Sequence, residues 1–585
     1  MTEKPAHLQL AQPEDDHSVS EWEAAAAGVL RKSRRLTDED PDSLVWDRLA
    51  RTTLDGITVA PLGTPAHLEG LTTAGRPTRT GAWDIRARVD DPDAALANES
   101  ALGDLAGGVT SLWVSADADT DLRTVLDGVL LDLAPVVLDA PAAPLAAARA
   151  LLALVAERDV QPHPATNLGV DPIGAVHRGV AGEDGWQDDL VAVARLAQEL
   201  GVLGVVVDAT AAHDLGASDA QELGYGLAVG AAYLRVLVDA GLSVVEAARL
   251  VEFRFAATDE QFPTIAKLRA ARRLWTRVLE LSGISTGSIG ESPMRLHAVT
   301  SRPMLSKYDP YVNMLRGTVA GFAAGVGGAD AVTVLPFDSA NGRPVELGRR
   351  IARNVNHLLI DESHVAEVAD PAGGAYAVER LTDDLAVAGW AELGEIETSG
   401  FDTFRGRIAA VVERREAEIA RRKRPITGLS EFPDLAETLP ERRPDPAADR
   451  VRRYGASFEE LRDQPAGQRV FLATLGTVAQ HTARATFASN LLAAGGVGVD
   501  VAGATTGTHD LVSRYAGQPV VCLAGSDAAY DQWGAEAAAA LRDAGAQHVI
   551  IAGKPVGPLA DAVDDSAAMG VDALAFLHRT RSRLS

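Results

Sequence analysis

The stretch Arg469-Val-Phe-Leu-Ala-Thr-Leu-Gly476, followed by Thr477-Val-Ala-Gln-His481-Thr-Ala-Arg484, has the order of a strand, a tight turn and a helix. A short apolar run bounded by glycine is typical of a fully buried strand. Strand-turn-helix units of this kind build parallel sheets that bind their ligands at the carboxyl ends of the strands. The stretch therefore predicts the first unit of a doubly wound α/β domain.

The chain that follows has the pattern such a domain needs. Residues 528–544 are rich in Ala, Leu and Glu, which favours a helix. Besides 470–475, strands are expected at four apolar runs, namely 497–502, 520–524, 548–553 and 571–577. Five strands within residues 466–585 predict a flavodoxin-like domain with a parallel sheet. The single Cys522 lies in one of the apolar runs and is expected to be a buried structural thiol.

Towards the N-terminus, residues 46–400 alternate short apolar runs with longer helical patterns. Examples of these runs are 108–114, 135–139, 202–208 and 329–335. Uniformly apolar strands indicate a parallel sheet that is covered by helices, and the length fits a TIM-like (β/α)8 barrel. The fold class is therefore α/β, with a barrel followed by the flavodoxin-like domain.

Two further segments lie outside these domains, one before the barrel and one between the two domains. Residues 1–45 form a polar arm with one short amphipathic helix around Trp22, which is expected to pack on a partner. Residues 401–465 contain a helix that ends in a run of cations before Pro425, and then several prolines. Cations in the last turn offset the helix dipole, and the proline-rich part is typical of an interdomain linker.

Composition narrows the possible functions. The 585 residues carry 55 Lys and Arg against 81 Asp and Glu, a net charge of −26, which argues against binding to nucleic acid or to an anionic membrane. No run reaches the roughly 18–20 apolar residues of a membrane span, and the N-terminus lacks the order of a signal peptide. No spacing typical of a metal site occurs, so no metal is assigned. A cytoplasmic protein is expected.

Several motifs resemble a known family, the adenosylcobalamin-dependent acyl-CoA mutases. Trp83-Asp-Ile-Arg86 resembles the family's Trp-Thr-Ile-Arg, and Lys267-Leu-Arg-Ala-Ala-Arg272 resembles its Lys-Met-Arg-Ala-Ala-Arg. Arg350-Ile-Ala-Arg-Asn354 and Asp370-Pro-Ala-Gly-Gly-Ala-Tyr376 resemble its later barrel motifs. The motifs occur in the family's order, and the resemblance implies a barrel followed by a cobalamin-binding-like domain.

The barrel positions that the resemblance assigns to catalysis are altered. Arg88 stands where catalytic chains have a tyrosine that faces the substrate, and Ala211 stands at their histidine. Val299 replaces a polar residue in Arg295-Leu-His-Ala-Val-Thr-Ser-Arg-Pro303, which resembles Arg-Thr-His-Ser-Gln-Thr-Ser-Gly-Trp. His213 lies two positions from the catalytic one, a displacement of about 6–7 Å along a strand, so it is not expected to take over that role.

The cobalamin-binding positions are altered as well. Catalytic chains have Asp-x-His-x-x-Gly, in which the Asp orients the cobalt-ligating His. Here Ala479 replaces the Asp and Arg484 replaces the Gly, while His481 remains and is expected to be a solvated loop residue. The later landmarks correspond to Ser526, Ala552 and Gly553, with Ala552 replacing a glycine. The resemblance therefore implies a degenerate cofactor site and no cobalamin on this chain.

Taken together, the departures resemble the small, non-catalytic subunits of methylmalonyl-CoA mutase. That resemblance implies a heterodimer with a catalytic large subunit, which binds adenosylcobalamin and interconverts (R)-methylmalonyl-CoA and succinyl-CoA in propionate and odd-chain metabolism. The complex would be an isomerase, and this chain alone would be inactive. Two alternatives are a self-sufficient mutase with a different cobalamin loop and a CoA-thioester binding protein without activity.

Overall fold

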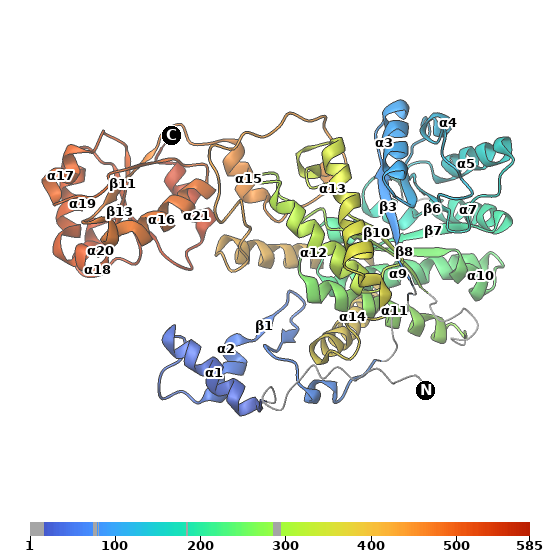
Figure 1. Ribbon diagram of the computed structural model, residues 1–585, viewed down its shortest axis with the longest axis horizontal. Coiled ribbons are helices and arrows are strands. Elements are labelled where there is room, and N and C mark those ends of the chain that lie inside the picture. Colours follow the sequence, from blue (N-terminus) through green and yellow to red (C-terminus); the bar gives the residue numbers. More distant parts are fainter. Residues whose placement is uncertain (1–16, 74–78, 80, 183–184, 285–293, 585) are drawn as a thin grey trace, which may run out of the picture.

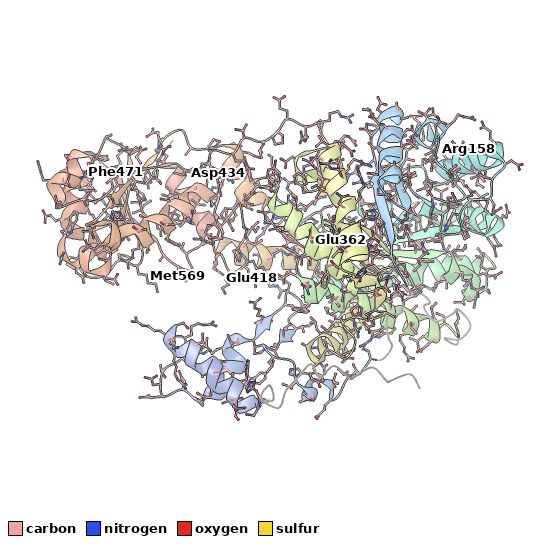
Figure 2. All side chains as sticks on the ribbon, in the orientation of Figure 1. Arg158, Glu362, Glu418, Asp434, Phe471 and Met569 are labelled. Carbon is pink, nitrogen blue, oxygen red and sulfur yellow. The ribbon has the colours of Figure 1, made fainter. Side chains whose placement is uncertain are left out.

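The computed structural model describes residues 17–73, 79, 81–182, 185–284 and 294–584. Figure 1 shows three parts, a barrel with its surrounding helices, a C-terminal sheet domain beside it, and a small N-terminal lobe. Figure 2 places Phe471 in the C-terminal domain and Asp434 in the segment between that domain and the barrel.

The large domain is a closed barrel of parallel strands, which confirms the predicted TIM-like fold. Its strands, in sheet order, are β3 (Asp84–Val89), β4 (Ser111–Ser115), β5 (Val136–Asp139), β6 (Asn167–Val170), β7 (Leu203–Asp208), β8 (Val251–Ala257), β9 (Arg295–Thr300) and β10 (Ala331–Thr333). The barrel closes where Ala331 and Val332 of the last strand pair with Asp84 and Ile85 of the first.

Helices follow the strands and cover the barrel. They are α3 (Ala94–Ala106), α4 (Leu122–Val125), α5 (Pro144–Arg158), α6 (Pro172–His177), α7 (Trp186–Leu200), α8 (Thr210–Asp214), α9 (Asp219–Asp239), α10 (Val244–Arg249), α11 (Gln261–Leu281), α12 (Val312–Val326) and α13 (Glu346–His357). Small residues let helix α9 approach the sheet. A Cβ at Gly230 of α9 would lie 2.9 Å from the ring of Phe253, and a Cβ at Gly226 would lie 3.0 Å from the ring of Phe255.

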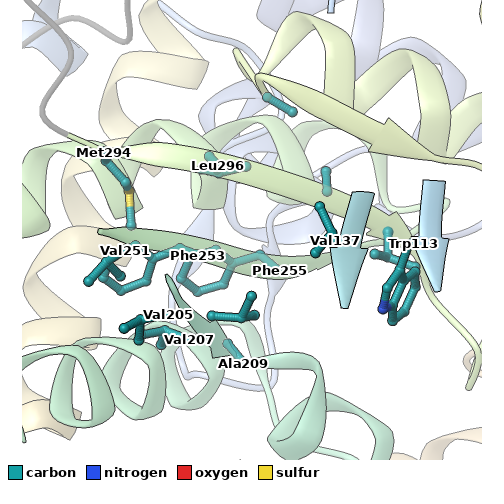
Figure 3. Close-up of a cluster of buried hydrophobic side chains, with 14 of the residues drawn as sticks. Trp113, Val137, Val205, Val207, Ala209, Val251, Phe253, Phe255, Met294 and Leu296 are labelled. Carbon is teal, nitrogen blue, oxygen red and sulfur yellow. The ribbon is translucent and has the colours of Figure 1, made fainter. Parts of the chain in front are cut away.

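Strand β8 shows how the sequence specifies the barrel. In Val251-Glu-Phe-Arg-Phe255, alternate side chains point to opposite faces of the sheet. Figure 3 shows Val251, Phe253 and Phe255 packed among other buried apolar side chains. Glu252 and Arg254 therefore point the other way, into the barrel.

A 45-residue helix, α14 (Tyr376–Ala420), follows the barrel and changes direction at Gly400, whose φ of 78° is favourable only for glycine. Beyond this kink, Phe404, Ile408 and Val412 still pack into the barrel core. The segment 401–420 is therefore structurally part of the barrel domain, although 401–465 reads as a linker in the sequence.

The C-terminal domain has a parallel sheet of five strands in the order β12-β11-β13-β14-β15. Numbered along this domain the order is 2-1-3-4-5, which is flavodoxin-like, as predicted. Its elements are β11 (Val470–Thr474), α16 (Val478–Ala494), β12 (Val499–Val501), α17 (Thr508–Ser513), β13 (Val520–Ala524), α18 (Asp527–Ala529), η9 (Tyr530–Gly534), α19 (Ala535–Asp543), β14 (His548–Ala552), α20 (Leu559–Ala562), β15 (Asp565–Ala567) and α21 (Ala573–Arg581).

One predicted strand of this domain is wrong. Residues 571–577 begin helix α21, and the fifth strand is the short β15 before it. The side chain of Asp572 accepts a hydrogen bond from the backbone N–H of Ala575 and caps the helix. Ala573, Phe576, Leu577 and Thr580 are buried at helical spacing, so the same apolar residues that suggested a strand form one face of a helix.

The N-terminal lobe has its own small core. Helices α1 (Val19–Lys32) and α2 (Val45–Leu49) pack together, and four buried apolar residues form the cluster, namely Ala27, Leu30, Leu36 and Val45. A hairpin of β1 (Arg51–Thr52) and β2 (Thr58–Val59) joins the lobe to the barrel. At its tip, Asp55 accepts a hydrogen bond from the N–H of Ala220 in the first turn of α9.

The segment between the two domains, which includes α15 (Ala456–Asp463), is extended and bonded to the barrel. The N–H of Arg452 donates to the carbonyl of Asp214, and the N–H of Tyr454 donates to the carbonyl of Pro303.

Within the part of the chain that the structure describes, no helix is long and apolar enough to cross a membrane.

Candidate functional site

The barrel interior holds a network of buried charges. Glu252 of β8 accepts hydrogen bonds from Arg86 of β3 at 2.7 and 3.3 Å and from Arg295 of β9 at 2.9 Å. The side chains of Arg86 and Glu252 are fully buried. Burial alone would raise the pKa of Glu252, but the guanidinium groups of Arg86 and Arg295 lower it to about 2. These residues form fixed ion pairs that span the barrel.

A second layer of the interior is built around Trp113 of β4, which is 1% exposed. The guanidinium of Arg254 lies 4.0 Å from the indole centroid, that of Arg88 lies at 5.2 Å and that of Arg302 lies at 5.7 Å. The ring of His297 meets the indole edge-on at 5.7 Å. Favourable cation–π geometry and burial make this cluster part of the barrel's packing.

Hydrogen bonds hold the members of this layer in place. Arg254 donates to Asp208 at 2.9 Å and to Nδ1 of His297 at 3.1 Å, while Nε2 of His297 lies 2.8 Å from the hydroxyl of Thr333. Burial, together with the neighbouring arginines, lowers the pKa of His297 well below its usual value. The imidazole is therefore neutral at physiological pH, and both its nitrogens already have partners.

The barrel positions that the family resemblance assigns to catalysis lie at the carboxyl end of the barrel. Arg88 pairs in register with Trp113, and Val299 pairs with Thr333, so both side chains project from the interior face of the sheet. Ala211 lies in the short helix α8 that follows β7 and is 2% exposed. The structure thus places Arg88 and Val299 on one surface. It offers no polar group at either Val299 or Ala211 that could stabilise charge on a substrate.

His213 lies on α8 and is bonded within the protein. Its Nε2 is 2.7 Å from the hydroxyl of Ser301, and its Nδ1 is 3.4 Å from Glu222. Glu222 in turn accepts from the Nζ of Lys267 at 2.6 Å, and all four side chains are buried. His213 therefore connects the ends of β7 and β9 to α9.

At the carboxyl end of the C-terminal sheet, Arg484 of α16 lies across the ends of β13 and β14. It donates to the carbonyl of Gly525 at 2.6 Å, and its other terminal nitrogen pairs with Asp527. The guanidinium lies 4.7 Å from the ring centroid of Tyr530. A Cβ built on Gly553 would be 3.3 Å from its Nε. The arginine therefore fills the space that faces Gly553.

Other altered positions lie beside Arg484. Ser526 caps α18 by accepting a hydrogen bond from the N–H of Ala529. Ala552 ends β14, and its carbonyl accepts a hydrogen bond from the hydroxyl of Tyr530 at 2.8 Å. Ser526, Ala552 and Gly553 thus surround Arg484 and Tyr530, whereas Ala479 lies in the exposed first turn of α16. The polar groups at this edge of the sheet bind one another.

The expectation for His481 is wrong. The residue lies within helix α16, 6% exposed, and is not a solvated loop residue. The capping box of Thr477 and Gln480 starts the helix before His481, and burial of His481, Ala485 and Ala488 on one face continues it. Its Nδ1 has no hydrogen-bond partner, so the carboxylate that would orient a cobalt-ligating imidazole is missing.

Sequence reasoning missed the residues that fill the barrel, above all Trp113 and Arg254. The alternation of charged and aromatic residues in β8 was the signal, because charges inside parallel strands must point into the barrel or towards solvent.

Among the residues that the structure describes, no group of three or more His, Cys, Asp or Glu side chains is placed to hold a metal ion.

Comparison with known proteins agrees with this architecture. The family model for methylmalonyl-CoA mutase matches residues 197–508. The methylmalonyl-CoA mutase small subunit of Streptomyces virginiae is 44% identical, with 99% of this chain and 98% of the relative covered. The probable small subunit of Mycobacterium tuberculosis is 40% identical over 96% of this chain and 97% of the relative.

The small subunit of Propionibacterium freudenreichii subsp. shermanii is 36% identical, with 94% of this chain and 91% of the relative covered. These matches extend over the barrel and the C-terminal domain together. They confirm the resemblance that the motifs indicated, and the chain belongs to the methylmalonyl-CoA mutase family.

Proposed function

We propose that this chain is the non-catalytic subunit of a heterodimeric methylmalonyl-CoA mutase. In the proposed complex, a large subunit binds adenosylcobalamin and interconverts (R)-methylmalonyl-CoA and succinyl-CoA in propionate and odd-chain metabolism in the cytoplasm. The names of the relatives support a partner, since each is called a small subunit. The chemistry would then belong to the partner and its cofactor.

The main support is the filled interior of the barrel. A ligand that entered along the barrel axis would have to displace Trp113 and break the bonds of Arg254 to Asp208 and His297. It would also meet the ion pair between Arg86 and Glu252, in which both side chains are fully buried. Removing one partner of such a pair costs about 3–5 kcal/mol. This arrangement favours a structural role over a CoA-thioester binding role.

The C-terminal domain supports the same proposal. The residues that face one another across the carboxyl end of the sheet do not fit a corrin ligand, because Arg484 lies against Gly553 and Tyr530. His481 is held in a helix with no carboxylate on its Nδ1. We therefore propose that cobalamin is bound by the large subunit and not by this chain.

The N-terminal lobe is the proposed clamp on the large subunit. Its core has four buried apolar residues and five partly buried ones, which is small for an independently stable segment of about 30 residues. Val19 and Val29 of α1 are 48% and 65% exposed, and they leave an apolar strip uncovered in this chain. A partner that covers this strip would supply the missing contacts.

Reconstitution tests the proposal directly. The purified chain with adenosylcobalamin and methylmalonyl-CoA should show no turnover, and activity should appear only when a large subunit is co-expressed and co-purified. Turnover by the single chain would favour a self-sufficient mutase. Saturable binding of CoA by the single chain, without turnover, would favour the CoA-thioester binding protein.

A further inference from the structure

A groove lies on the outside of the barrel domain, between the helices α9, α10, α11 and α14 (Figure 1). These helices pack against one another. The groove has a volume of about 440 Å3, which lies within the roughly 300–1,000 Å3 of small-molecule pockets. The described residues that line it come from these helices and the turn after α11, and none belongs to a barrel strand. The groove is therefore separate from the candidate site inside the barrel.

The lining of the groove is mainly apolar. Three of its apolar residues are buried, namely Leu234, Val278 and Leu393. Val238 of α9 and Leu281 of α11 are 37% and 61% exposed, and Trp390 of α14 is half-buried. Apolar surface that faces water gains free energy when an apolar group covers it. The groove therefore favours a ligand with an apolar body.

The charged residues of the lining leave one negative charge unpaired. Arg235 of α9 pairs with Glu397 of α14 at 2.8 Å, so these two charges offset each other. Asp239, the last residue of α9, also lines the groove and has no ion-pair partner among the described residues. Arg195 donates to the carbonyl of Ala240 at 2.6 Å but does not line the groove. Helices α9 and α11 both end at the groove, where a helix dipole is negative. A positively charged group complements this arrangement.

The size of the groove favours a small molecule over a protein segment. About a dozen residues line it, whereas each side of a standard protein–protein interface contributes roughly 20–30 residues. Trp390 gives the lining an aromatic surface. Indole rings attract cations and recognise quaternary ammonium groups.

We propose that this groove binds an amphipathic organic cation, a small molecule with an apolar body and one ammonium group. The apolar body lies against Val238, Leu281 and Trp390, and the ammonium group lies near Asp239. The site is independent of the proposed subunit role, because it is outside the barrel and requires neither cobalamin nor a CoA thioester. It gives the chain a binding activity of its own for a small ligand.

Titration calorimetry on the full chain tests the site with three probes, namely octyltrimethylammonium, octan-1-ol and octanoate, each below its micelle concentration. The probes share an apolar chain and differ in charge, so their affinities separate the apolar contribution from the electrostatic one. Saturable binding of octyltrimethylammonium is expected. Octanoate should bind about fivefold more weakly or worse, because its charge is repelled by Asp239.

Asp239→Asn removes the unpaired charge at an exposed position, so the variant should fold. It should weaken the binding of octyltrimethylammonium about two- to fivefold and leave that of octan-1-ol unchanged. Glu199→Gln is the matched control, since Glu199 is exposed in the last turn of α7 and does not line the groove. It should leave the affinity for each probe within about twofold of the wild type.

Ala231→Leu places a larger side chain in the groove and should weaken octyltrimethylammonium and octan-1-ol alike, by about tenfold or more. Ala150→Leu, on the exposed side of α5, is its control. No saturable binding of octyltrimethylammonium, an equal affinity for octanoate, or equal losses in the controls would overturn the proposal. Self-association of the chain that Ala231→Leu abolishes would also overturn it, because a second copy would then occupy the groove.

Discussion

Replacing Glu252 by leucine should destabilise the barrel by about 3–5 kcal/mol, because the change leaves Arg86 buried without its main partner. The shift in the pKa of Glu252 corresponds to a similar change in the free energy of unfolding. The difference between the ordinary pKa of 4.5 and about 2 corresponds to about 3 kcal/mol. The carboxylate is stabilised in the folded state, so this contribution is present above about pH 4.5 and is lost as the pH falls towards 2.

Urea unfolding followed by tryptophan fluorescence measures the effect at pH 7, since Trp113 and Trp275 are buried in the barrel. Glu280→Leu is the control. That residue forms an exposed pair with Arg277, and its loss should change stability by less than about 1 kcal/mol. A loss below about 1 kcal/mol for Glu252→Leu, or a loss that grows on acidification from pH 4.5, would refute the view that the interior charges hold the barrel together.

Three further predictions concern the other parts of the chain. Deleting residues 1–45 should weaken co-purification with the large subunit, and unchanged assembly would exclude the N-terminal lobe as the clamp. Residues 466–585 alone should unfold cooperatively and fail to retain cobalamin after dialysis; a His-ligated spectrum that disappears on His481→Ala would show the opposite. Burial and the neighbouring Asp219 raise the pKa of Asp55 from 3.8 to about 6, so docking of the hairpin should weaken as the pH rises from 3.8 to about 6. Thermal unfolding should therefore show Asp55→Asn more stable than the wild type at pH 7.5, with a smaller gain at pH 5.

Much of the fold could be predicted from the sequence because its strands are apolar and bounded by turns. The strands predicted at 520–524 and 470–475 agree within a residue with β13 and β11. The run 571–577 is ambiguous because Ala573, Phe576 and Leu577 suit either a buried strand or one face of a helix. The cap made by Asp572 decided between them, and a single capping residue is a weak signal in a sequence.

The contacts within the candidate site could be predicted less well from the sequence. The family motifs located Arg88 and Arg484 as altered positions, but they could not show which groups those side chains would contact. Arg484 binds Gly525, Asp527 and Tyr530, and these partners come together only when α16 and β13 are folded. The burial of His481 was missed for the same reason, since the capping box that extends α16 shifts the residue from the turn into the helix.

The paired charges inside the barrel have a consequence for the order in which a complex forms. A hollow barrel that awaits a ligand lacks internal contacts until the ligand arrives. In this barrel Arg86, Glu252 and Arg295 already satisfy one another. The barrel should therefore mature soon after synthesis and persist as a preformed scaffold, while the thin N-terminal lobe stays susceptible to proteases until a second chain covers it. If the proposed large subunit is made in too small an amount, trimmed molecules with an intact barrel should accumulate.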